Sequence, residues 1–110
     1  MRLVVESLAG EVVGAVDLFE FDPHNRRAGV GIIIDAAHRR KGYALAALMA
    51  LEGYVREVLQ MRQLWCGITE DNAASLKLFA RAGYAECGRR RGWYLTPDRE
   101  LDEVLFQKLL

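Results

Sequence analysis

The stretch GIIIDAAHRRKGYA, residues 31–44, decides the architecture of this chain of 110 residues. The almost wholly apolar run that leads into it, residues 28–34, is typical of a central β-strand covered on both faces. A basic, glycine-containing turn follows. From Tyr43 to residue 59, apolar residues recur at three- and four-residue steps, which indicates a helix. The stretch is therefore a strand, a basic turn and the start of the longest helix.

Similar patterns place further elements on both sides of this unit. Val- and Leu-rich runs at residues 3–8 and 12–21 indicate two strands joined by a hairpin at residues 9–11. Residues 63–68 form another strand. A second helix, capped by Asp71 or Asn72, runs to Ala82 and is ended by Gly83. Residues 85–95 and 103–110 indicate a last antiparallel pair.

This order of elements defines the fold class, which is mixed α/β. It predicts a twisted, mostly antiparallel sheet with two helices. The strand, helix and strand between residues 28 and 68 form one right-handed crossover, so one central pair of strands is parallel.

Composition limits the class of protein. With 52% hydrophobic and 27% charged residues, the chain fits one globular domain over residues 1–110. Fifteen basic and fifteen acidic residues cancel, so no overall positive field draws the chain to nucleic acid or to an anionic membrane. No apolar run approaches the roughly 20 residues that a membrane span needs. We expect a cytoplasmic protein without a nucleic-acid or membrane partner.

The two cysteines indicate neither a metal site nor a disulfide. Cys66 and Cys87 lack metal-ligand spacing and stand in strand-like contexts. We expect both to be buried thiols in a reducing compartment. No metal is therefore expected in the protein.

The basic turn has the chemistry of a diphosphate site. Arg39, Arg40 and Lys41 supply charge, Gly42 lets the backbone come close to a ligand, and Ala44 keeps the helix start small. The first N–H groups of a helix are unpaired, and its dipole adds about half a positive charge. The spacing fits neither a Walker loop nor a three-glycine dinucleotide fingerprint. A solvated charge run and a nucleic-acid patch are the alternatives.

Two linked motifs resemble those of the GNAT acetyltransferases. Arg39, Gly42 and Ala44 match the family's pattern Arg/Gln-x-x-Gly-x-Gly/Ala, and residues 70–84, including Asn72, look like its second cofactor motif. Residues 16–28 are similar to bacterial spermidine and diamine acetyltransferases and to ribosomal-protein-type enzymes. The resemblance covers essentially the whole chain.

The resemblance implies a GNAT fold with acetyl-CoA as co-substrate and no metal. The cofactor is expected along a splayed gap between the parallel strands at residues 28–34 and 63–68. Compared with the family, the chain lacks the usual first strand and first helices, so it is expected to be a fragment or late-start form, or to have its missing cover supplied by a partner chain. Exposed apolar sheet surface then favours a homodimer.

Roles for individual residues also follow from the resemblance. Backbone N–H groups of the last strand residues are expected to pair with pantetheine and to stabilise an oxyanion. Asn72 is expected to approach the pantetheine arm. Phe79 occupies a position where many members carry a Tyr that protonates the leaving thiolate, and it is either beside the cofactor or a core aromatic. The expected cofactor residues are Ile32, Ile33, Ile34, Arg39, Arg40, Lys41, Gly42, Tyr43, Ala44, Asn72 and Phe79.

The implied reaction is direct attack of a primary amine on the thioester of acetyl-CoA. The amine, with a pKa of about 10.4, must lose a proton. Glu20 and Asp22 are the candidate bases, with Asp17 and Glu70 also considered; ion pairing with arginines is the alternative role of these carboxylates. The acceptor is a polyamine-like small molecule or a protein amine. Because phenylalanine at position 79 has no proton to give, a catalytically silent CoA-binding or assembly module is the competing hypothesis.

Overall fold

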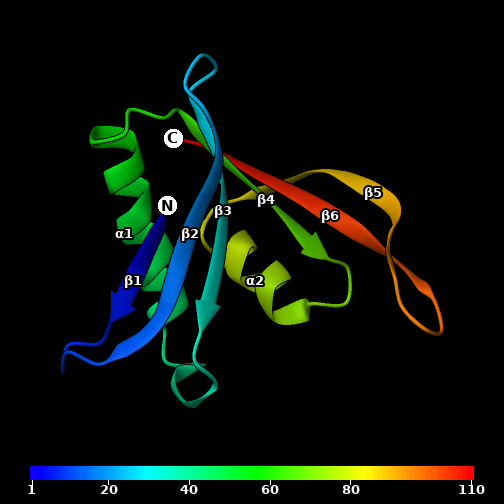
Figure 1. Ribbon diagram of the computed structural model, residues 1–110, viewed down its shortest axis with the longest axis horizontal. Coiled ribbons are helices and arrows are strands. Elements are labelled where there is room, and N and C mark those ends of the chain that lie inside the picture. The colour runs from blue at the N-terminus through cyan, green and yellow to red at the C-terminus, as the bar shows by residue number, and fades with distance from the viewer.

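The computed structural model describes residues 1–110 as a six-stranded sheet with the strand order β1-β2-β3-β4-β6-β5 (Figure 1). Every neighbouring pair is antiparallel except β3 and β4, which are parallel, so the expected fold class is confirmed. The elements are β1 (Arg2–Glu6), β2 (Val12–Asp22), β3 (Arg27–Ile34), the short 3₁₀ helix η1 (Ala36–His38), α1 (Tyr43–Glu57), β4 (Gln63–Thr69), α2 (Ala73–Arg81), β5 (Ala85–Leu95) and β6 (Glu100–Leu109).

Both helices pack on the same face of the sheet. Leu48, Leu51 and Val55 of α1 and Phe79 of α2 belong to one buried cluster with side chains from the central strands, among them Leu64. These α1 residues follow the periodicity read from the sequence. Neither helix has the length and hydropathy that crossing a membrane requires.

The parallel pair is short, and this shapes the middle of the molecule. β3 and β4 pair only at Arg27 with Gln63, Ala28 with Leu64 and Gly29 with Trp65. Beyond Gly29 the two strands diverge, and α2 is visible in the opening between them (Figure 1). The expected splayed gap is therefore present, at the carboxyl ends of both strands.

The opposite face of the sheet carries no helix. Direct partners across β4 and β6 share a face, so Trp65 and Gly67 lie with Leu105 and Glu103 away from the buried Cys66 and Phe106. We call this surface the open face. On it the ring of Phe19 covers Gly29 and meets Trp65 edge to face, with ring centroids 5.5 Å apart.

Two local features differ from the sequence prediction. Asp35 accepts a hydrogen bond from the Ala37 N–H at 2.9 Å and caps η1, a turn too short to leave a periodic signal. The prediction that both thiols are buried is wrong for Cys87, which lies exposed in a bulge of β5. Cys66 is buried, and burial raises its pKa to about 12. Neither forms a disulfide.

One ion pair joins three elements of the core layer. Lys108 of β6 lies 2.5 Å from the Glu52 carboxylate of α1 and donates to the Ala82 carbonyl at the end of α2, at 2.6 Å. The side chains of Lys108 and Glu52 are only 17% and 20% exposed. This ammonium thus fixes both helices to the sheet.

We expect Lys108→Ala to lower the free energy of unfolding by about 2 kcal/mol, because it removes two hydrogen bonds and leaves the largely buried Glu52 carboxylate with only the exposed Arg56 as an ionic partner. Urea denaturation measures the change. Arg56→Ala is the matched control: Arg56 contacts the same Glu52, at 3.7 Å, but is 49% exposed. Its loss should cost less than about 0.5 kcal/mol. Equal costs for the two variants would contradict the role assigned to Lys108.

Candidate cofactor and acceptor site

The loop between β3 and α1 presents an uncapped helix N-terminus. Gly42 is the N-cap of α1, has φ +83° and makes no side-chain capping bond. The helical ladder begins with the Ala46 N–H donating to the Gly42 carbonyl at 3.0 Å. A Cβ at Gly42 would meet no atom within 4 Å, so the space on that side of Gly42, at the start of the helix, is open. Unpaired N–H groups and the helix dipole at Gly42, Tyr43 and Ala44 give this end of α1 the chemistry that suits an anion.

Arg40 also adopts the left-handed conformation, with φ +64°. For a residue with a Cβ this costs roughly 1–2 kcal/mol, which glycine would avoid. The loop therefore folds as though two glycines stood in it, although the sequence has only one. The conformation sets the course of the chain between η1 and Gly42.

The positive charges of this loop are not neutralised by the protein. Arg40 and Lys41 are exposed and form no salt bridge. The Arg39 Nε atom donates to the Ile34 carbonyl at 3.1 Å, which anchors the side chain without a carboxylate. In contrast, Arg89 and Arg90 are paired with acidic groups. The basic cluster that remains available for an anion is the one beside the free helix N-terminus.

His38 ties this loop to the β1–β2 turn, which the sequence did not predict. Its Nε2 atom lies 3.2 Å from the Glu11 carboxylate, and its Nδ1 atom lies 3.6 Å from that of Asp35. The ring also meets Tyr43 edge to face at 6.1 Å. No local sequence pattern predicts a contact between positions 11 and 38, because this contact depends on how the strands pair.

The backbone of β3 offers hydrogen-bonding groups to the gap. The Asp35 N–H donates to the Val13 carbonyl at 2.7 Å, and bonded and non-bonded pairs alternate along antiparallel strands. By this alternation the N–H and C=O groups of Ile33 face β2, while those of Ile32 and Ile34 face the gap. The Ile34 carbonyl indeed accepts from Arg39. Ile32 and Ile34 are thus the residues able to pair with a chain lying in the gap.

Asn72 and Phe79 of the second motif lie in different environments. Asn72 caps α2 through its Oδ1, which accepts from the Ser75 N–H at 3.2 Å, and its amide donors make no protein hydrogen bond. Phe79 is 3% exposed and packs edge to face on Tyr84, with centroids 5.0 Å apart. Phe79 is thus a core aromatic, and burial raises the pKa of the Tyr84 phenol.

A polar hollow of about 430 Å³ opens near the start of the gap and includes open-face residues. Two of its lining residues are acidic. Glu20 lies in a bulge of β2 and has a left-handed backbone with φ +48°, and Asp22 ends β2. The lining residues are Glu20, Asp22, Arg27, Trp65, Cys87, Arg90, Leu105 and Phe106.

The candidate bases differ in how they are held. Asp22 accepts from the backbone and side chain of Asn25, and these bonds hold its pKa below its usual range. Asp17 is bound by Arg2 at 2.7 Å, and Glu70 by Arg89 at 3.2 Å. Glu20 makes no hydrogen bond or ion pair and is exposed. Among these four carboxylates, Glu20 is the one whose charge is left for a cation.

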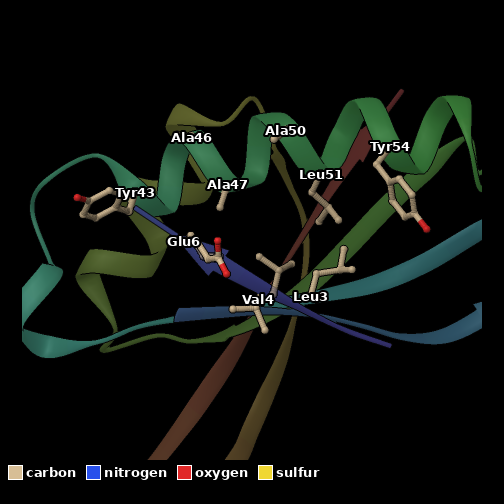
Figure 2. Close-up of a pocket in the computed structure, with 11 residues that line it drawn as sticks. Leu3, Val4, Glu6, Tyr43, Ala46, Ala47, Ala50, Leu51 and Tyr54 are labelled. Atoms are coloured by element: carbon tan, nitrogen blue, oxygen red, sulfur yellow. The ribbon is translucent and has the colours of Figure 1, made fainter. Parts of the chain in front are cut away.

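A second hollow, between β1 and α1, has no such chemistry. It measures about 360 Å³, and Figure 2 shows Tyr43 and Tyr54 on α1 beside its opposite ends, with Leu3 and Val4 on β1. All but one of the residues lining it are hydrophobic; the exception is Glu6. An apolar groove whose only charge is negative does not suit a diphosphate.

A family model described as the acetyltransferase (GNAT) domain matches residues 1–85. The chain belongs to the GNAT acetyltransferase family. Spermidine N(1)-acetyltransferase of Vibrio cholerae is 28% identical over 87 residues, which is 79% of this chain and 50% of that protein. The Escherichia coli K12 protein of the same name is 31% identical over 84 residues, 76% of this chain and 45% of its own length. This GNAT chain thus spans about half the length of these relatives.

Solved structures agree with the fold. The Vibrio cholerae spermidine N-acetyltransferase in complex with CoA and spermine superposes with a TM-score of 0.91 at 25% identity, over 98% of this chain and 64% of that one. A putative phosphinothricin N-acetyltransferase gives a TM-score of 0.86 at 30% identity, over 99% and 70% of the two chains. GNAT enzymes use acetyl-CoA, and the loop's unpaired charges and free N–H groups fit its diphosphate.

We expect Gly42→Glu to weaken CoA binding by about 10- to 100-fold, because like charges about 4 Å apart repel by 1–4 kcal/mol near a protein surface. Calorimetric titration measures it. Gly10→Glu is the matched control, since Gly10 also has a left-handed φ of +84° and open space around a Cβ, but lies in the β1–β2 turn. Both variants should lose about 1–2 kcal/mol of stability. If Gly42→Glu binds CoA as tightly as the unaltered chain, the diphosphate does not bind at this loop.

Proposed function

We propose that this chain binds acetyl-CoA along the gap between β3 and β4 and transfers the acetyl group to a primary amine. The observation that carries the proposal is the loop at residues 39–44, where three unneutralised cations stand beside an uncapped helix N-terminus. Such a site suits the pyrophosphate of CoA. From there the gap leads along unpaired backbone groups towards Gly29, where the strands meet.

The gap positions the cofactor for direct attack by the amine. Ile32 and Ile34 offer backbone groups to pantetheine, as a neighbouring strand would, and Asn72 adds its amide donors. A backbone N–H aimed into the gap can also stabilise the negative charge on the carbonyl oxygen when the amine adds. Arg39, Arg40 and Lys41 hold the diphosphate end.

The acceptor proposed for this site is a polyamine-like small molecule. The hollow near the start of the gap is lined by the free carboxylate of Glu20, by Asp22 and by Trp65, the last β4 residue paired with β3. Carboxylates and an indole face suit an ammonium group attached to an alkyl chain. The names of the relatives from Vibrio cholerae and Escherichia coli, which describe acetylation of spermidine, support this class. A protein amine is the alternative acceptor.

We also propose that the chain forms a homodimer and that it is cytoplasmic. A homodimer would cover part of the open face, where Ile33 is 63% and Val4 58% exposed. A related spermidine N-acetyltransferase from Vibrio cholerae is described as dodecameric, which supports self-association in general. A cytoplasmic location suits the two free thiols. Light scattering after size-exclusion chromatography measures the assembly.

The activity test is release of CoA thiol from acetyl-CoA with spermidine, a diamine and a short peptide as acceptors. Calorimetry first establishes binding of CoA to the same chain. A higher rate of thiol release with spermidine than with the peptide supports the proposed acceptor class. Thiol release with the peptide alone would instead make a protein amine the acceptor. Binding without turnover across all amines would favour the silent CoA-binding module, to which Phe79 points.

For the acceptor hollow we expect Glu20→Gln to raise the KM for spermidine about tenfold, because it removes a charge-assisted contact worth about 1.4 kcal/mol. The KM for acetyl-CoA should not change. Glu57→Gln is the matched control, since Glu57 ends α1 and its side chain is 75% exposed. If both variants keep the wild-type KM for spermidine, Glu20 does not face the acceptor.

A further inference from the structure

A carboxylate that the sequence did not single out lies over the start of the gap. Glu103 of β6 faces the open side, and its carboxyl group rests directly on Gly67 of β4, so that a Cβ at Gly67 would overlap it. Gly67 stands two residues beyond Trp65, the last β4 residue paired with β3. The side chain of Glu103 is only 13% exposed.

The opening beneath this carboxylate is free of side chains on both strands. Gly31 of β3 and Gly67 of β4 each stand two residues past the last parallel pair, Gly29 with Trp65. Residues two apart on a strand share a face, so both glycines belong to the open face. The side chain nearest to a Cβ at Gly31 is Phe19, at 3.8 Å. A reactant on the open face can therefore reach the gap between these glycines.

Two neighbours hold the Glu103 carboxylate in place. The Tyr94 hydroxyl donates to its Oε2 at 3.0 Å, and the Arg90 Nε atom lies 3.2 Å from its Oε1. Arg90 also lines the hollow that contains Glu20, and it stacks on Trp93 at 4.5 Å. The Tyr94–Glu103 pair therefore adjoins both the proposed acceptor hollow and the free part of β4.

Phenols elsewhere are poorly placed to act in the gap. Phe79 offers no hydroxyl, and Tyr84 is buried against it. Tyr43 and Tyr54 lie on α1, by the apolar groove on the helix side of the sheet (Figure 2). Tyr94 is the remaining phenol. Burial, followed by the hydrogen bond to Glu103, raises its pKa, so the hydroxyl keeps its proton at neutral pH.

We propose that Glu103 and Tyr94 carry the proton of the attacking amine to the leaving thiolate. The inference rests on the proposed acetyl transfer and supplies the acid that position 79 lacks. The neutral amine attacks the carbonyl carbon, the C–N bond forms, and an N–H proton passes to Glu103. As the oxyanion collapses, the C–S bond breaks and sulfur takes its electron pair. Tyr94 then gives its proton to sulfur and regains one from Glu103, so both groups end as they began.

The test compares Tyr94→Phe and Glu103→Gln with the unaltered chain. We expect each to lower kcat by about 100-fold, the order of a lost acid–base group, with the affinity for CoA unchanged. Tyr54→Phe is the control for loss of a phenol and should change kcat by less than about twofold.

Gly67→Ala tests whether the position of the Glu103 carboxylate matters. It keeps the Tyr94 hydroxyl and the Glu103 carboxylate, but its added methyl group pushes that carboxylate aside. Gly67→Ala should therefore lower kcat although both groups are present. If Glu103→Gln misfolds and loses CoA binding, Gly67→Ala replaces it as the test of Glu103. Turnover in the unaltered chain together with near wild-type kcat in Tyr94→Phe and Glu103→Gln overturns the inference alone. Absence of turnover in the unaltered chain overturns the proposed function and the inference with it.

Discussion

The rest of the structure depends on the early end of pairing between β3 and β4. Parallel strands normally satisfy each other's backbone groups along their length, but here the ladder stops at Gly29 and Trp65. The groups beyond it must be satisfied by another molecule or by water. The same divergence separates the carboxyl ends of β3 and β4, and β3 continues into the loop that leads to the N-terminus of α1. The opening and the anion site are therefore consequences of one break in the sheet.

Packing on the helix side explains why the break is tolerated. The core cluster continues beneath the gap through Leu64 and Cys66 of β4 and Phe79 of α2, so apolar packing holds the strands in place where no hydrogen bonds join them. Lys108 adds a charged tie at the far side of α2. The open face has no such layer, and chemistry can be placed there without disturbing the core.

Most of the fold could be read from the sequence because its signals are local. The apolar run before Arg39, the periodicity of α1 and the Asn72 cap with Gly83 each depend on neighbouring residues, and the structure places the elements where these patterns indicate. The candidate site was predictable only in part. The cofactor loop is contiguous, whereas Glu103, Tyr94 and Gly67 come from three strands and meet only through register. The left-handed Arg40 also leaves no trace in residue type.

The two thiols lie in unequal environments, so one of them can be labelled selectively. Cys66 lies in the core, and burial raises its pKa to about 12, so it stays protonated and sheltered. Cys87 is exposed on the wall of the hollow that holds Glu20. Alkylating reagents attack thiolates that solvent can reach, so a fluorophore maleimide should label the chain once, at Cys87. Such a dye would stand on the wall of the proposed acceptor hollow, where a change in its fluorescence would test whether a polyamine binds there, without any engineered cysteine.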